Sequence, residues 1–286
     1  MSLTFDNILN FRDVGKTIND YLGRKVVREG VLYRSARPDD ASPADRKKLK
    51  DELGIRTVVD LRTKTEHLKQ AQKRRASALP PHSDAALTEP LQIPGLRYRA
   101  IKVTGRRFEI FLLRQLAWYS LFKLLILFLL GYRTQAIAIL GREVMQPRGL
   151  VGLGIVTLDE SGAEIAEALR TLTTPSSLPV LVHCTQGKDR TGLIIALALM
   201  ALVPTDAISH DYLLSRQGLA ADRDSGARLE EIREIGLTPE WGDVPDDFVE
   251  RIRGHLRAKY GGVEGYLDGI GFGKDERERL VDVLGA

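Results

Sequence analysis

The chain has 286 residues, of which 43% are hydrophobic and 28% charged, enough for one large α/β domain with a buried core. Its formal net charge of +4 suits an anionic substrate or an anionic membrane surface. The basic residues form no aromatic-interleaved stripe, so we expect no nucleic-acid partner. The single cysteine excludes an internal disulfide, and the N-terminus lacks a signal-peptide pattern, so we expect a reducing compartment, the cytoplasm.

The first part of the sequence alternates between strand and helix patterns. Residues 31–33 form a short apolar run that predicts a strand, and Ser42 followed by Pro43 predicts the start of a helix that ends before Gly54. The β-branched run at 55–61 predicts a second, buried strand. This order favours an α/β fold with a central, mostly parallel sheet flanked by helices.

The next segment departs from that alternation. Residues 69–95 are first basic and then rich in Ala, Pro and Ser, and we expect a long loop there. Residues 116–130 are almost entirely apolar, but Lys123 interrupts a run that is shorter than the roughly 20 residues of a membrane-spanning helix. Three alternatives stay open for this stretch: a core helix or helical hairpin, a helical lid over an active site, or a contact with a membrane surface. We interpret 67–145 as a loop-and-lid insertion within a single domain spanning 1–286.

Helical patterns dominate the rest of the chain. Ser161 with Glu164 predicts a capping box at the start of a helix. Residues 180–182 predict a short buried strand, and 193–203 predict an apolar helix that ends before Pro204. Between this strand and helix lie ten residues: His183, Cys184, Thr185, Gln186, Gly187, Lys188, Asp189, Arg190, Thr191 and Gly192.

This strand–loop–helix passage is typical of a phosphate-binding cradle. Cys184 and Arg190 are separated by five residues, so the loop can turn its backbone N–H groups inward around one tetrahedral anion. The N-terminus of the following helix adds partial positive charge, Gly187 permits a tight turn, and the planar guanidinium of Arg190 can bind two phosphate oxygens. His183 and Asp60 are expected to support the loop. The predicted phosphate-binding site is completed by Thr185, Gln186, Lys188, Thr191 and Gly192.

The same arrangement predicts a covalent mechanism centred on Cys184. Positive charge beside a thiol favours the thiolate, which can attack phosphorus and form a phosphocysteine. A general acid must protonate the leaving oxygen; Asp189 lies inside the cradle and is the first candidate, and Asp60, which could instead hold the loop in place, is the second. Thr191 is expected to hydrogen-bond the sulfur, and Lys188 is either a solvated lysine or a rim cation for a second anionic group. We expect no metal or other cofactor, because the cradle itself supplies the positive charge.

Several segments resemble those of a known family. They are NFRDVG at 10–15, LYRSA at 32–36, DLR at 60–62 with Glu66, the loop at 183–192, DYLLS at 211–215 and GGVE at 261–264. They are similar to those of the atypical tyrosine and lipid phosphatases of bacteria and fungi, within the protein-tyrosine-phosphatase-like superfamily. The resemblance implies one phosphatase domain with helical lids over the site, in which Cys184 is the nucleophile, Arg190 binds phosphate and Asp189 is the acid. It also implies activity on phosphotyrosine and often on phosphoinositides.

The sequence leaves three functions open. The first is hydrolysis of phosphotyrosine in proteins, with some phosphoserine or phosphothreonine. The second is hydrolysis of a phosphoinositide or inositol phosphate, for which Lys188 and a membrane-facing helix at 116–130 would provide contacts. The third is a phosphate-binding module without catalysis, which the presence of Cys184, Asp189 and Arg190 disfavours.

Overall fold

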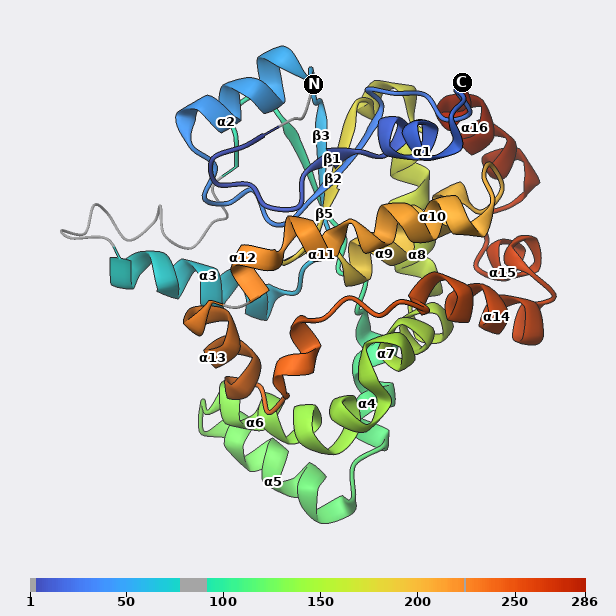
Figure 1. Cartoon of the computed structure of the whole chain (residues 1–286). Helices are drawn as coiled ribbons and strands as arrows, with labels where there is room; N and C mark the ends of the chain where they lie inside the picture. The colour runs from blue at the N-terminus through green and yellow to red at the C-terminus, as the bar shows by residue number, and fades with distance from the viewer. Residues whose placement is uncertain (1–3, 78–91, 224) are drawn as a thin grey trace.

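The fold is built on a five-stranded sheet, which the computed structural model places at the centre of residues 4–77, 92–223 and 225–286, the part of the chain that it describes. The strand order is β1–β2–β5–β3–β4 (Figure 1). β1 pairs with β2 in antiparallel fashion, and the other neighbours are parallel. The strands are β1 Arg12–Asp13, β2 Leu32–Ser35, β3 Thr57–Asp60, β4 Arg97–Ala100 and β5 Val180–His183. The predicted α/β class with a mostly parallel sheet is therefore confirmed.

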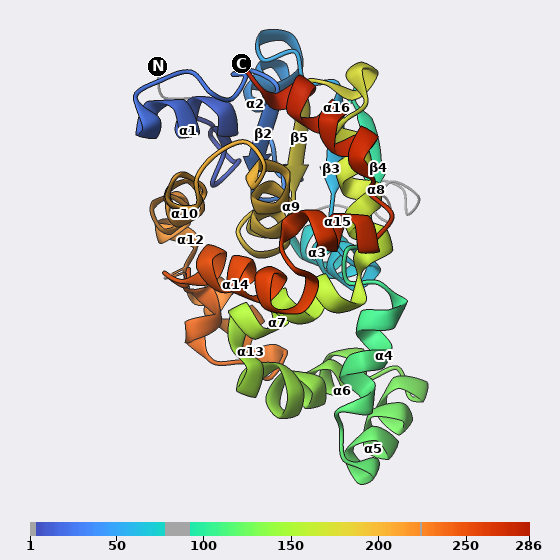
Figure 2. The ribbon, with the colours of Figure 1, turned by 90° about the vertical axis from the view of Figure 1, so that its right-hand side faces the viewer.

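Helices surround the sheet and extend beyond its carboxyl end (Figures 1 and 2). Those before β5 are α1 Val14–Leu22, α2 Pro43–Lys47, α3 Lys64–Ser77, α4 Arg106–Arg114, α5 Trp118–Leu129, α6 Arg133–Leu140, α7 Gln146–Glu160 and α8 Gly162–Leu172. Those after it are α9 Asp189–Leu199, α10 Thr205–Leu213, α11 Ser215–Gly218, α12 Ala220–Arg223, α13 Gly226–Glu234, α14 Phe248–Tyr260, α15 Val263–Gly269 and α16 Lys274–Leu284. Shorter π and 3-10 turns are η1 Lys48–Glu52, η3 Gly141–Met145, η4 Pro175–Ser177 and η5 Pro239–Gly242.

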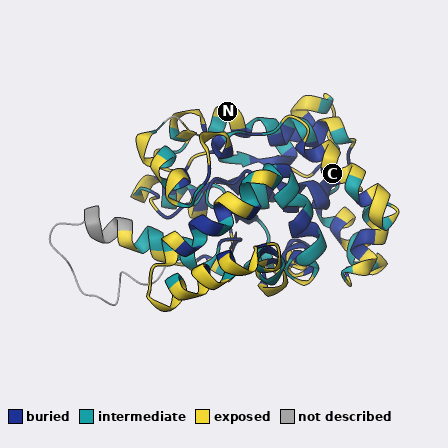
Figure 3. Cartoon of the chain, turned by 90° about the horizontal axis from the view of Figure 1, so that it is seen from below, coloured by how far each residue is buried: buried dark blue, intermediate teal, exposed yellow. Residues whose placement is uncertain are grey.

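Both faces of the three inner strands β2, β5 and β3 are buried, whereas the edge strand β4 is largely exposed. Successive side chains along a strand point to opposite faces, so each inner strand contributes to two cores. Val180 and Val182 of β5 join the larger core, to which α1, α8 and α9 contribute, whereas Leu181 joins a smaller core beneath α2 and η1. The centre of the molecule, where the inner strands lie, is dark blue in Figure 3, whereas the outer sides of the surrounding helices are yellow. The apolar runs of β3 and β5, rather than alternation, fit this two-sided burial.

The two predicted helix starts, at Ser42 and Ser161, have different outcomes. Ser42 caps α2 by accepting from the N–H of Asp45, whose carboxylate accepts from the N–H of Ser42, and the helical segment ends before Gly54 at φ +62°. The helix after Ser161 is confirmed, but its capping box is wrong: Ser161 makes no side-chain cap bond. Ser161 also ends α7, and this shared position holds its backbone at φ −125° and ψ 31° rather than in the extended conformation of an N-cap.

The predicted loop at 69–95 is wrong over its first residues. Helix α3 runs from Lys64 to Ser77, so the basic segment is helical, and 78–91 lie outside the described residues. Thr63 and Glu66 start this helix as a capping box: the Thr63 N–H donates to Glu66, and the Glu66 N–H donates to the Thr63 hydroxyl.

The apolar stretch at 116–130 forms helix α5, which packs on α6 as a helical hairpin at the end of the molecule remote from α2 (Figures 1 and 2). The hairpin itself was expected, but burial of this stretch in the core was not correct, because most of its large side chains are exposed. Within the described residues, no helix combines the length and apolarity needed to span a membrane.

Candidate active site

The predicted cradle lies at the carboxyl end of β5, the central strand. His183 of β5 is in register with Ser35 of β2 on one side and with Asp60 of β3 on the other. The carboxyl ends of three parallel strands therefore meet where the chain enters the loop at Cys184, and α9 begins five residues later at Asp189. Ligands of open parallel sheets commonly bind at this edge.

Gly187 gives the loop its turn. Its φ of +69° lies in the left-handed region, and a Cβ there would come within 2.1 Å of the carbonyl oxygen of Ser35. In this conformation the Gly187 N–H donates to Cys184 Sγ at 3.2 Å. The structure thus aims a backbone amide at the predicted nucleophile, as a loop that cradles an anion requires.

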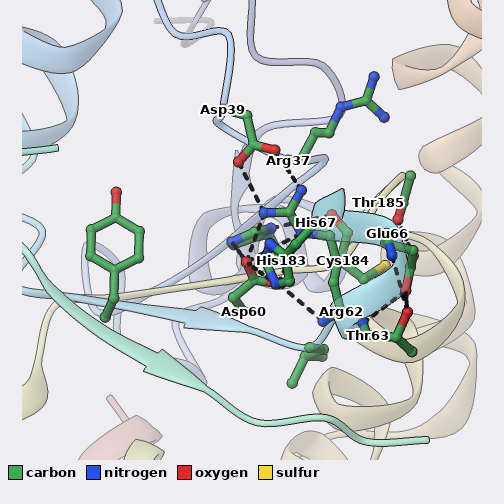
Figure 4. Close-up of polar contacts among 12 residues, drawn as sticks. Arg37, Asp39, Asp60, Arg62, Thr63, Glu66, His67, His183, Cys184 and Thr185 are labelled. Carbon is green, nitrogen blue, oxygen red and sulfur yellow. Dashed lines mark hydrogen bonds and ion pairs between the residues drawn. The ribbon is translucent and has the colours of Figure 1, made fainter. Parts of the chain in front are cut away.

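Arg190 projects from the first turn of α9 and is held by Glu66 at the start of α3. Its Nη1 and Nη2 atoms lie 2.7 and 2.5 Å from the two carboxylate oxygens, and Thr185 of the cradle also donates to Glu66 (Figure 4 labels Glu66 and Thr185). Burial alone would raise the pKa of Glu66, but the charge and hydrogen bonds of Arg190 hold it well below the usual range. Glu66 therefore accepts hydrogen bonds from both terminal nitrogens of the guanidinium, Nη1 and Nη2. The Nε atom makes no hydrogen bond to another residue that the structure describes, and Nη1 also donates to the carbonyl oxygen of Leu61 at 3.2 Å.

Asp60 belongs to a buried ionic network beside the cradle (Figure 4). Its carboxylate accepts from Arg62, which also binds Asp39 at 2.5 Å, and it lies 3.5 Å from Nε2 of His183. Burial alone would raise the pKa of Asp60, but nearby His183 and Arg62 hold it well below the usual range. Burial also lowers the pKa of His183. An ionised carboxylate bound to arginine has no proton to donate, so of the two roles considered for Asp60 the structure favours support of the loop.

A second buried network braces the cradle from behind. Arg34 of β2 donates to the carbonyl oxygen of Gly187 at 2.6 Å and to Asp211 of α10 at 2.5 Å. Asp211 also accepts from Arg12 at 2.8 Å. Burial would raise the pKa of Asp211, and the two arginines lower it. Arg12, Arg34 and Asp211 all fall in segments of the family resemblance, but the sequence alone assigned them no role.

Gln186 connects the cradle to more distant segments. Its carbonyl oxygen accepts from Asn10 at 2.9 Å, while its side chain donates to Asp222 of α12 and accepts from Arg228 of α13 at 3.0 Å. These contacts on the outer side of the cradle come from α12 and α13, not from the 67–145 insertion. The lid role of that insertion stays a prediction.

Lys188 does not occupy the rim of the site. Its side chain is fully buried, and its ammonium donates to the carbonyl oxygens of Trp241 and Asp243 at 3.0 and 2.5 Å. Burial lowers the pKa of Lys188. Both interpretations made from the sequence, a solvated lysine and a rim cation, are wrong, because the turn at the end of the loop points this side chain into the protein.

Two polar groups in the first turn of α9 have no hydrogen-bond partner among the residues described: Oδ1 of Asp189 and the hydroxyl of Thr191. Both atoms are buried, so each is a group with unused hydrogen-bonding capacity next to Cys184 and Arg190. Gly192 follows, where a Cβ would come within 2.9 Å of the Tyr212 ring. Small size at Gly192 thus lets α9 approach α10 closely.

Within the described residues, no group of three or more His, Cys, Asp or Glu side chains is arranged to hold a metal ion. The positive charge at the site comes from Arg190 and from the backbone N–H groups at the start of α9.

The sequence matches a known family over nearly its whole length. The model of the tyrosine phosphatase family matches residues 3–285. The chain belongs to the tyrosine phosphatase family. This membership confirms the predicted family and the predicted enzyme class, a phosphoric monoester hydrolase of the tyrosine-phosphatase type.

Individual relatives of the chain carry phosphatase names. It is 32% identical over 170 residues to a tyrosine-protein phosphatase from Nostoc commune, covering 53% of this chain and 57% of that protein. It is 28% identical over 273 residues to a putative tyrosine-protein phosphatase from Cupriavidus necator, covering 93% and 82%. It is 32% identical over 123 residues to the triple specificity protein phosphatase PtpB from Mycobacterium tuberculosis, covering 37% and 44%. The matches therefore span less than two thirds of the Nostoc and mycobacterial proteins.

Proposed function

We propose that the protein hydrolyses phosphotyrosine in proteins through a phosphocysteine intermediate on Cys184. The observation that carries the proposal is the geometry of the cradle. Cys184 Sγ accepts a hydrogen bond from the Gly187 N–H, and the guanidinium of Arg190 is held by Glu66, while its Nε atom makes no hydrogen bond to a described residue. These groups can stabilise the charge on the equatorial oxygens of a transferring phosphoryl group.

In the first step the thiolate of Cys184 attacks phosphorus, and the bond from phosphorus to the tyrosine oxygen breaks. Asp189 donates a proton to that oxygen, so tyrosine leaves neutral. In the second step a water molecule gives a proton back to Asp189 and attacks phosphorus, which releases phosphate and restores the thiolate. The unpartnered buried oxygen of Asp189 and the commitment of Asp60 to Arg62 support this assignment of the acid. The hydroxyl of Thr191 makes no hydrogen bond to a described residue, Cys184 included, so its bond to the leaving sulfur is proposed for the second step alone.

The substrate range is proposed to extend to phosphoserine and phosphothreonine, in keeping with the name of the mycobacterial relative, a triple specificity protein phosphatase. The phosphoinositide alternative loses one of its supports, because Lys188 is buried and cannot bind a second phosphate at the rim. We also propose a cytoplasmic location, where reducing conditions keep the single cysteine as a free thiol.

The decisive experiment measures turnover of a phosphotyrosine peptide, phosphoserine and phosphothreonine peptides and a panel of phosphoinositides, with EDTA present. Cys184→Ser should abolish turnover yet keep orthovanadate or phosphate binding, since the amides and Arg190 remain. Rapid-quench mass spectrometry of the parent protein should find Cys184 phosphorylated. Turnover by Cys184→Ser near the parent rate would refute the nucleophile, and faster turnover of phosphoinositides than of the peptide would refute the substrate class.

A further inference from the structure

Helix α5 carries a concentrated patch of exposed apolar side chains. In the part of the chain that the structure describes, thirteen large hydrophobic side chains are exposed, and nine of them fall between residues 118 and 132. The most exposed are Leu129 at 85% and Trp118 at 82%. Single exposed hydrophobic residues are ordinary on protein surfaces, whereas a contiguous group of this kind marks a contact surface.

The helix presents this patch along one side. Trp118, Phe122, Leu125 and Leu129 follow one another at spacings of four, three and four residues, so they line one face of the helix. Ser120 and Leu124 are buried on the opposite face, toward α6. The helix is thus anchored on one side while its aromatic and aliphatic side chains project outward at the end of the molecule, where α5 lies in Figures 1 and 2.

The segment that carries the patch contains cations but no acidic residue; Glu143, at its end, accepts a hydrogen bond from Ser120 on the buried face of α5. Between Glu109 and Glu143 the chain has no Asp or Glu, but it has four exposed cations: Arg114, Lys123, Arg133 and Arg142. None of the four forms an ion pair with another residue that the structure describes. On the neighbouring helix α13, Glu231 and Glu234 pair with Arg228 and Lys69 instead. An apolar face with Trp, Tyr and Phe, in a segment whose exposed charged residues are cations without an ion pair to the described residues, matches the chemistry of an anionic lipid surface.

We propose that the outer face of α5 binds the surface of an anionic lipid bilayer, with the helix in the headgroup region and Trp118, Phe122 and Leu129 inserted. At about 1.5 Å per residue its twelve residues span about 18 Å, too short to cross a bilayer but sufficient to lie in its interface. Trp and Tyr favour this boundary because their rings are apolar and their polar atoms can stay hydrated. A second copy of the chain fits the patch less well, because a two-fold contact would bring the same four cations together.

The experiment measures co-sedimentation of the full chain with vesicles of phosphatidylcholine alone and of phosphatidylcholine mixed with phosphatidylserine. Neither vesicle contains a phosphorylated inositol lipid, so binding is independent of turnover. The apolar variant is Trp118→Ser with Phe122→Ser and Leu129→Ser, and the charge variant is Lys123→Glu. Their matched controls lie on α16, at the opposite end of the molecule: Val281→Ser, an exposed apolar side chain, and Lys274→Glu, an exposed cation.

We expect binding to the anionic vesicles that weakens with salt. It should fall at least about fivefold in the charge variant and more than about tenfold in the apolar variant, and stay unchanged in both controls. Turnover of soluble 4-nitrophenyl phosphate and thermal unfolding should stay at the parent level, which separates this surface from the catalytic site. Equal vesicle binding by parent and variants, or no binding by the parent, would overturn the proposal. So would sedimentation equilibrium that shows a dimer dissociated by the apolar variant while the vesicles stay unbound.

Discussion

The contact between Glu66 and Arg190 offers the sharpest test of how the site is positioned. Replacing Glu66 by Gln keeps the length and shape of the side chain but removes its charge. The carboxylate now accepts two bonds from the guanidinium and one from Thr185. An amide can accept with only one of its two ends, and its NH₂ group would face an N–H of Arg190. The variant therefore loosens the guanidinium without leaving a cavity.

The free energy lost in Glu66→Gln depends on how far the Glu66–Arg190 pair is exposed to solvent. A hydrogen bond to a charged group contributes about 1.5–3 kcal/mol when well shielded. Glu66 and Arg190 expose 28% and 19% of their side chains, so we expect a loss near the lower end, about 2 kcal/mol. If Arg190 stabilises the transition state, that loss corresponds to about a 30-fold decrease in kcat/KM.

The assay is kcat/KM for 4-nitrophenyl phosphate, together with orthovanadate affinity and thermal unfolding. Glu167→Gln is the matched control, because Glu167 also pairs with an arginine, but at an exposed position on α8. We expect Glu66→Gln to lose activity and orthovanadate affinity together, and Glu167→Gln to lose neither. A Glu66→Gln variant that is less stable yet has parental kcat/KM would show that the ion pair only holds α3 in place, and would refute the positioning role.

Other expected outcomes concern the acid, the loop turn, the buried lysine and the ionic network. Asp189→Asn should slow hydrolysis of alkyl phosphates more than of aryl phosphates with good leaving groups, measured as a ratio of kcat values; equal losses would place the acid elsewhere. Gly187→Ala should abolish activity and lower the free energy of unfolding by about 1–3 kcal/mol in urea titrations. Alanine would have to adopt φ +69°, and its Cβ would lie 2.1 Å from the carbonyl oxygen of Ser35; parental activity would contradict this. Lys188→Met should lower the free energy of unfolding by about 1–3 kcal/mol, since it leaves the carbonyl oxygens of Trp241 and Asp243 without this donor. A raised KM at unchanged stability would instead indicate that Lys188 contacts the substrate. Asp39→Asn should destabilise the fold by about 3 kcal/mol at pH 7, because buried Arg62 loses one of its two carboxylates. Although burial alone would raise the pKa of Asp39, Arg62 holds it below its usual value, so the stabilisation is complete above about pH 4 and is lost as the pH falls through the lowered pKa. The gap in unfolding free energy between Asp39→Asn and the parent should therefore narrow in acid, and a gap independent of pH would contradict the linkage.

The cradle was predictable because its determinants are local. A strand, a tight turn with Gly187 and a helix that starts at Asp189 all lie within a few residues of Cys184, and each has a signal in the sequence. The mostly parallel sheet followed from the same kind of local pattern, since an apolar β-branched run after a capped helix implies a strand–helix–strand unit.

Apart from Asp60, the partners of the cradle could not be predicted, because they come from distant parts of the chain. Glu66 lies 124 residues before Arg190, and Arg34 reaches Gly187 across 153 residues. The direction of Lys188 depends on carbonyl groups more than fifty positions away. The helix at 69–77 was missed for a different reason: its composition is basic and without apolar periodicity, whereas its start is fixed by the box of Thr63 and Glu66.

The anchoring of the cradle also bears on how the protein acquires activity as it folds. Segments near Asn10, Arg34, Glu66 and Trp241 each hold one part of a loop that follows β5, and Asp211 holds Arg34 in turn. A folding intermediate with the sheet formed but α10 to α13 still undocked would contain the thiol and the arginine without their geometry. If α10 to α13 dock after the sheet has formed, the return of turnover during refolding would report completion of the whole chain rather than formation of its core.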